Sequence, residues 1–179
     1  MWVLLSVLMF MPTGGSTNLV NLQGKWTVGL RMSDFLTFSE YSVLWRPWKT
    51  VMIGIEGNAY LKKYDYSNDF HYRGGSVSIG LYKYFRAYSS FSPFIVLSPG
   101  FRYYEDTYNQ RKQTYSVSIS PGVEYFFGLM GKQLSLKFKT SLVSFSRTYA
   151  ENKYVEDDMS FYLPTGGSLS TWLCFHFQP

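Results

Sequence analysis

The chain has 179 residues, the size of a single domain, and it is rich in aromatic residues and poor in charge. Aromatic residues make up 20% and charged residues 16%, whereas a typical soluble domain is roughly 25% charged. Beyond the first residues no apolar run approaches the ~20 residues of a membrane helix, which excludes a helical membrane protein. The net charge of +5 comes from scattered lysines and arginines, so we expect no nucleic-acid partner.

The N-terminal segment is apolar from Trp2 to Met11 and is followed by small residues from Pro12 to Ser16. This is the length of a signal-peptide core with its cleavage region, although no basic residues precede it. A start further upstream, an atypical signal and an apolar N-terminal strand all remain open. We therefore treat residues 1–18 as a signal-like segment and residues 19–179 as one β-barrel domain.

From Gly24 onward, apolar and polar residues alternate with a period of two, which is typical of β-strands. In chain order the alternating segments are 25–32, 40–45, 51–61, 75–88, 95–104, 114–127, 133–147 and 168–177. In the sixth segment, for example, Val117 and Ile119 alternate with Ser116 and Ser118. Most of these strands are longer than the five or six residues usual in soluble sheets and fit a tilted membrane-spanning strand.

The connections between these segments alternate in length. Residues 46–49, 89–92 and 128–132 are expected to be tight turns, whereas 62–74, 105–112 and 148–167 are longer and polar. The first connection, near Ser33 and Asp34, is a short exception. Short turns at one end and long loops at the other are typical of outer-membrane barrels. The sequence therefore predicts an all-β fold, a closed up-and-down antiparallel transmembrane β-barrel of about eight strands.

The polar face of the strands consists mainly of Ser, Gly, Thr and Tyr, with few charges. A soluble lipocalin-like barrel is the structural alternative, but its exterior would carry abundant Lys, Glu, Asp and Gln. We therefore expect the polar face to line a narrow lumen, where enclosed charges must be paired. The predicted lumen ion-pair network consists of Arg31, Glu40, Glu56, Arg102, Glu124, Lys137 and Lys139.

Aromatic residues near the strand ends of the apolar face are expected to lie at the membrane interface, where amphipathic rings are favoured. These predicted interface aromatics are Trp45, Tyr103, Tyr115, Tyr125 and Phe177.

Three segments resemble the families of small eight-stranded outer-membrane β-barrels, especially the bacteroidete-type outer membrane protein beta-barrel domain. They are Ser120–Phe127, Gly80–Phe85 and the last strand with its alternating aromatics ending at Phe177. The resemblance covers the chain from about Gly24 to the end. It implies a bacterial outer-membrane location, contact with lipid and lipopolysaccharide, and insertion by the barrel-insertion machinery through a C-terminal aromatic signal. Gln178 and Pro179 follow Phe177, a departure from that signal.

The candidate catalytic and metal-binding residues of this sequence do not match the spacing of known sites. A lipid-modifying triad needs Ser, His and a carboxylate in reach of one another, but neither His71, in the 69–73 segment with Asp69, nor His176 has a serine two residues further on. Glu56 and Glu124 are better explained as partners of lumen cations than as an acid/base pair. The acidic stretch 151–158 lacks the ligand spacing of a calcium loop, and the single Cys174 has no ligand cluster around it.

The predicted function is accordingly a non-enzymatic one, without a cofactor or a metal. We expect an integral outer-membrane barrel with a polar lumen filled by side chains, serving the envelope structurally or through a larger outer-membrane protein complex. The alternatives are a small-molecule or lipid-binding barrel and, less favoured, an enzyme that modifies lipid A.

Overall fold

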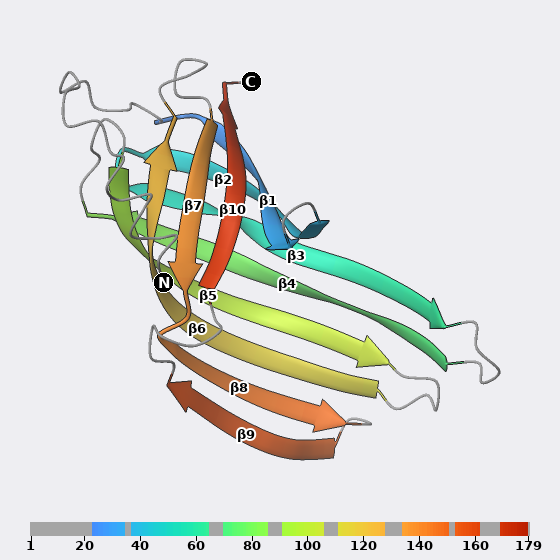
Figure 1. Cartoon of the computed structure of the whole chain (residues 1–179). Helices are drawn as coiled ribbons and strands as arrows, with labels where there is room; N and C mark the ends of the chain where they lie inside the picture. Colours follow the sequence, from blue (N-terminus) through green and yellow to red (C-terminus); the bar gives the residue numbers. More distant parts are fainter. Residues whose placement is uncertain are drawn as a thin grey trace.

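A computed structural model gives the fold of the protein and describes residues 23–34, 37–64, 70–85, 91–105, 111–127, 134–150, 153–161 and 169–178. The signal-like segment 1–18 and the 128–132 turn lie outside these ranges. The described strands are β1 (Trp26–Asp34), β2 (Thr37–Trp48), β3 (Val51–Tyr64), β4 (Phe70–Tyr84), β5 (Phe91–Glu105), β6 (Arg111–Phe126), β7 (Leu134–Thr140), β8 (Val143–Ala150), β9 (Lys153–Phe161) and β10 (Leu169–Phe177) (Figure 1). No helix long and apolar enough to span a membrane occurs in this part of the chain.

The strands form one closed antiparallel barrel. Consecutive strands pair from β1 to β7, then β7 pairs with β10, and β10 pairs with β1 to close a ring of eight strands. The predicted all-β, closed antiparallel barrel is therefore confirmed. The Lys49–Thr50 turn and Phe177 mark one end, called the turn end here, and Tyr64, Glu105 and Arg111 mark the opposite, loop end.

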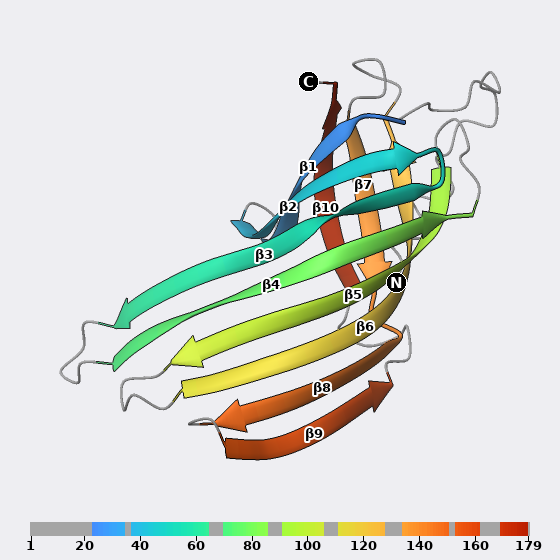
Figure 2. The same ribbon diagram turned by 180° about the vertical axis from the view of Figure 1, so that it is seen from behind.

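Near the loop end the barrel continues as a wider sheet. The first half of β6 pairs with β8 from Lys112 to Ile119, its second half pairs with β7, and β8 pairs with β9. Both views show β8 and β9 beside β6, away from β7 and β10 (Figures 1 and 2). Strands β7 and β8 follow each other along β6 and together make up the single strand expected over 133–147, interrupted at Ser141 and Leu142.

Several expected connections are shorter than predicted. Strand β3 continues to Tyr64 and β4 starts at Phe70, so that part of the expected 62–74 loop is strand, and β9 occupies part of the expected 148–167 loop. The expected 46–49 turn is displaced, because β2 continues to Trp48. The physical reason is that a backbone hydrogen-bond ladder does not require apolar side chains, so polar residues extend it.

The apolar face of the strands points outward. Residues such as Val43, Ile55, Ile79, Val117 and Phe145 are between 44% and 59% exposed. Their neighbours on the opposite face are buried or line the interior. This orientation is the reverse of that in a soluble lipocalin-like barrel, whose apolar face encloses the core.

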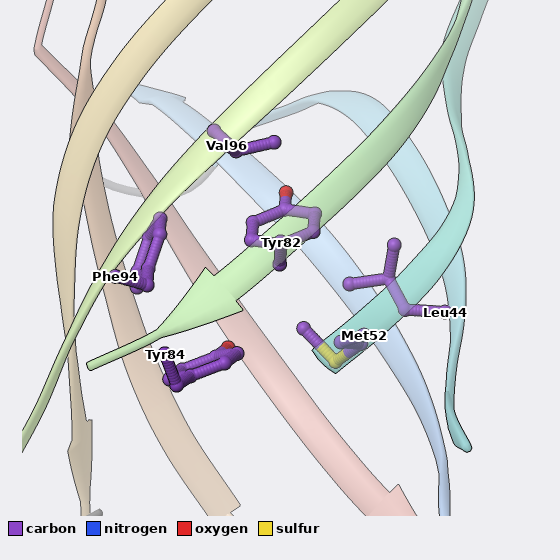
Figure 3. Packing of buried hydrophobic residues seen from close by; sticks show 6 residues of the cluster. All are labelled: Leu44, Met52, Tyr82, Tyr84, Phe94 and Val96. Atoms are coloured by element: carbon purple, nitrogen blue, oxygen red, sulfur yellow. The ribbon is translucent and has the colours of Figure 1, made fainter. Parts of the chain in front are cut away.

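The interior near the turn end is packed with large side chains. Figure 3 shows Leu44, Met52, Tyr82, Tyr84, Phe94 and Val96, which come from β2, β3, β4 and β5 and form the buried apolar cluster. Tyr82 and Tyr84 each pack against Phe94 with ring centroids 5.3 Å apart. The sequence predicted a polar inner face, but this end of the interior also contains these apolar side chains, because inward side chains must fill a barrel of eight strands.

Candidate functional site

The carboxylate of Glu124 is the centre of the buried polar groups at the turn end. Glu124 lies on β6 and is fully buried. Tyr84 Oη donates to its Oε2 at 2.6 Å, Ser135 Oγ donates to its Oε1 at 2.7 Å, and Arg46 Nη2 lies 3.6 Å from Oε2. The Arg46 guanidinium also lies 4.2 Å from the centroid of the Tyr84 ring. Side chains from three other strands thus compensate one buried carboxylate, as a buried charge requires.

His176 joins this group from the last strand. Its Nε2 is 2.8 Å from Ser135 Oγ and 3.4 Å from Glu124 Oε1, and its Nδ1 is 2.8 Å from Thr27 Oγ1. Strand β10 brings His176 here because Ser170, Trp172, Cys174 and His176 alternate inward. We call Thr27, Arg46, Tyr84, Glu124, Ser135 and His176 the base cluster.

The base cluster contains a serine, a histidine and a carboxylate, but not in a catalytic arrangement. Thr27, rather than the carboxylate, occupies the second ring nitrogen of His176, and Glu124 accepts directly from Ser135. In a triad the carboxylate orients the histidine through that second nitrogen. None of the Ser135, His176 and Glu124 side chains is more than 1% exposed, so no substrate can reach the Ser135 hydroxyl. The arrangement is suited to packing and charge neutralisation.

A second buried ion pair lies closer to the loop end than the base cluster. Glu56 on β3 accepts hydrogen bonds from Tyr82 Oη and from Lys139 Nζ. The Lys139 ammonium is also 5.0 Å from the centroid of the Trp172 ring. Glu56 is only 5% exposed, so the pair closes the interior above the apolar cluster.

The seven predicted network residues all lie on the inner face, but they do not form one network. Arg31 donates to Glu40 at 2.5 Å, and Lys139 pairs with Glu56. Glu124 pairs instead with Arg46 and His176. Lys137 is buried with its Nζ 4.6 Å from the Tyr82 ring centroid, and Arg102 makes no ion pair with any residue that the structure describes.

The sequence did not predict Arg46 as an interior residue, because Pro47 and Lys49 favoured a turn over residues 46–49. His176 was not included in the predicted lumen ion-pair network. Continuing the inward alternation of Ser42 and Leu44 by one more step would have placed Arg46 in the interior. The same step from Cys174 places His176.

The predicted interface aromatics occupy both ends of the outer surface. Trp45 stacks on Trp26 at the turn end, with ring centroids 6.3 Å apart, and Tyr125 contacts Phe127. Phe177 is 43% exposed there. At the loop end, Tyr115 packs against Phe101 at 5.2 Å, and Tyr103 Oη donates to Glu105 at 2.5 Å.

Other candidates from the sequence have simple structural roles. In the acidic stretch, Asp157 accepts two hydrogen bonds from Arg147 on β8, at 2.7 and 3.0 Å. No group of three or more metal-ligating residues occurs within the described ranges. His71 lies on β4, and Asp69 lies outside the described residues.

A polar cavity of about 440 Å³ occupies the interior above Glu56 and Lys139. Half of the residues that line it are serines, which come from β4, β5, β6, β8 and β9 together with Ser141 and Ser170. The charged residues Arg31, Glu40, Arg102 and Asp158 also line it. The barrel interior is thus divided into a packed turn end and a hollow, serine-rich loop end.

The comparisons with known proteins leave the family open. No protein-family profile and no curated protein matches the chain. Among solved structures, the chain is similar to a major outer membrane protein from Thermus thermophilus, with 14% identity and a TM-score of 0.44, over 86% of this chain and 98% of that chain. Such a distant likeness identifies no family, so the bacteroidete-type family stays a prediction.

Proposed function

We propose that the protein is an integral β-barrel of a bacterial outer membrane, with a structural or partner-binding role in the envelope. The observation that carries this proposal is the inverted distribution of polarity. The strands expose Val, Ile, Leu and Phe outward, while ion pairs and serines lie inside. A lipid environment favours such an exterior, whereas soluble monomers rarely expose contiguous apolar patches of this extent.

The residues at the two ends of the apolar surface also support a position in a membrane, with the apolar face toward lipid. At the loop end, outward ion pairs replace apolar residues: Glu105 lies 2.7 Å from Arg73 and 3.5 Å from Arg111. At the turn end, Trp26, Trp45 and Trp48 are exposed. Charged groups and aromatic rings are favoured at the level of the lipid headgroups. We therefore propose that the aromatics form the girdles of a membrane barrel and that lipid and lipopolysaccharide surround it.

The base cluster supports a lumen without an open channel. Arg46, Tyr84, Glu124 and His176 fill the turn end, and each is at most 2% exposed. Ions crossing the barrel would have to separate these paired groups, which is costly in a low-dielectric interior. The proposed role therefore depends on the barrel surface and its loops, including contacts with the insertion machinery or a larger complex, and includes no catalysis.

A small-molecule-binding role is the second candidate, because the cavity of about 440 Å³ is of the size that ligand sites have. A lipid-modifying activity has no comparable support, since the Ser135, His176 and Glu124 side chains are enclosed.

Fractionation of the host envelope tests the proposal. We expect the protein in the outer-membrane fraction and, after detergent extraction, a gel band that shifts on boiling. Planar bilayers containing the protein should show no steady conductance. Recovery in the soluble fraction without detergent would contradict the membrane placement, and a stable conductance would contradict the filled lumen.

A further inference from the structure

The serines of the loop-end cavity form an ordered array. Two rows of inward residues cross neighbouring strands in register. The first row runs Ser98, Ser118, Ser144 and Ser160 across β5, β6, β8 and β9, and the second runs Gly100, Ser116, Ser146 and Asp158. Directly opposed residues on antiparallel strands are about 4.5–5.5 Å apart, so the hydroxyls repeat regularly over one wall of the cavity.

Most of these hydroxyls have no hydrogen-bond partner among the described residues. Ser160 donates to Asp158 and Ser170 to the Lys139 carbonyl. By contrast, the described structure gives no hydrogen bond to the side chains of Ser78, Ser98, Ser116, Ser118, Ser120, Ser141, Ser144 and Ser146. Ser120 is the most enclosed of these serines, because its side chain lines the cavity although the residue is only 7% exposed. Since no described residue bonds to these hydroxyls, their partners are water or a ligand inside the cavity.

The charges of the wall are balanced. Arg31 is paired with Glu40 and Lys139 with Glu56. Arg102 and Asp158 add one charge of each sign at the loop end. The wall therefore has no net charge to select an anion or a cation. Each serine hydroxyl offers one donor and two acceptor positions, which is the same chemistry that a sugar hydroxyl offers in return.

The cavity is also large enough and accessible. Its volume of about 440 Å³ lies within the roughly 300–1,000 Å³ range of ligand sites. Gly57 and Gly100 are part of its wall and add no side chains, and a Cβ at Gly100 would lie 3.1 Å from Ser78 Cβ. Arg102 and Asp158 are exposed, so the cavity reaches solvent at the loop end. Below it, Glu56 and Lys139 form the floor.

From these observations we infer that the loop-end cavity is a binding site for a neutral, polyhydroxylated group, that is, a saccharide. The saccharide can be free in solution or can be the headgroup of a glycolipid, since both present the same hydroxyls. This inference does not depend on the membrane placement, because the serine wall belongs to the inner face of the sheet and not to its outer surface.

The test compares isosteric substitutions at two opposed serines, Ser118 and Ser144. Ser118→Val with Ser144→Val removes both hydroxyls, and Ser118→Thr with Ser144→Thr adds the same volume but keeps them. Maltose is titrated by calorimetry into the full chain in lauryldimethylamine oxide micelles, which contain no sugar. We expect binding that weakens about tenfold or more in the valine pair and much less in the threonine pair.

A second arm separates the two sources of the saccharide. The same proteins are placed in phosphatidylcholine nanodiscs with and without digalactosyldiacylglycerol, and the thermal unfolding midpoint is measured. Stabilisation by the glycolipid alone, lost in the valine pair, identifies a headgroup site, whereas calorimetric binding of maltose identifies a site for free saccharide. Heat-modifiable gel migration shows that each variant is folded, and Ser98→Val with Ser98→Thr replaces the pairs if either pair misfolds.

Two results would overturn the inference. If wild-type protein responds to neither maltose nor the glycolipid, the cavity holds water only. If the valine and threonine variants bind equally well, the saccharide binds outside the serine wall.

Discussion

The guanidinium of Arg46 on β2 lies 3.6 Å from the carboxylate of Glu124 on β6, and both side chains are at most 3% exposed. The two strands are not neighbours in the ring, so the pair spans the interior. Arg46 Nε and Nη2 have no hydrogen-bond partner among the described residues, and the carboxylate is therefore the main group that compensates the buried cation.

Replacing Glu124 by Gln should destabilise the barrel strongly, because it leaves Arg46 buried without its counter-charge. We expect a loss of roughly 3–5 kcal/mol in the free energy of unfolding, measured by urea titration in lipid vesicles. The matched control is Glu40→Gln, which breaks the partly exposed pair with Arg31 and should cost about 1 kcal/mol or less. Equal losses in the two variants would show that Glu124 does not hold the interior together.

A substitution at Gly54 tests how closely the backbones of β2 and β3 approach each other. A Cβ at this position would lie 2.2 Å from the Val43 carbonyl oxygen and 2.5 Å from Leu44 Cα. Both are backbone atoms and cannot rotate away, so Gly54→Ala should cost about 1–3 kcal/mol of unfolding free energy, as overpacking does. Gly100→Ala is the control, since its Cβ would meet its nearest neighbour, Ser78 Cβ, only at 3.1 Å. A Gly54→Ala variant as stable as Gly100→Ala would contradict the close approach.

The period of two predicted the strands. The composition of the polar face, mainly Ser, Gly, Thr and Tyr with few charges, predicted that the apolar face points outward. The meeting of Ser135 and His176, which are 41 residues apart, depends on the register between strands. A single sequence does not contain that register. The same limit applies to the serine array. Ser116 and Ser118 were assigned to the polar face of one strand but were not aligned with residues of other strands, and Ser160 fell in an expected loop.

Strand β9 was missed for a different reason. Its centre is acidic, with Glu156, Asp157 and Asp158, and the exposed apolar residues Met159 and Phe161 follow them. Composition alone favoured a loop. The strand forms because β8 offers a free edge from Val143 to Ala150, and the Arg147–Asp157 pair fits across it.

The outward face should behave as a lipid-facing surface. Ile79 is 50% exposed and lies opposite Ile55 in the apolar band. Ile79→Lys should therefore lower the free energy of unfolding in vesicles by about 2–4 kcal/mol, as a lysine near the bilayer midplane does. Gln113→Lys, close to the loop-end ion pairs, should cost only about 0–1 kcal/mol. If Ile79→Lys is harmless, water rather than lipid surrounds this surface.

Glu105 should give the loop end a distinct pH dependence. The hydrogen bond from the Arg73 guanidinium, followed by that from Tyr103, lowers the pKa of the Glu105 carboxyl from 4.5 to about 2. A carboxyl whose pKa is lower in the folded state contributes stability that is complete above its unfolded pKa and is lost as the pH falls towards its folded pKa. The contribution of this contact should therefore decline between pH 4.5 and about pH 2.

Arg73→Gln tests this contribution, because it removes the guanidinium that donates to Glu105 and leaves the Tyr103 bond and the Arg111 ion pair in place. Thermal unfolding of wild type and variant should differ most near neutral pH, and the difference should shrink as the pH falls below 4.5. Arg31→Gln serves as the control, since its partner Glu40 lies on another part of the barrel. A difference between wild type and Arg73→Gln that stays constant down to about pH 2 would show that the guanidinium acts through packing, not through the ionised carboxylate.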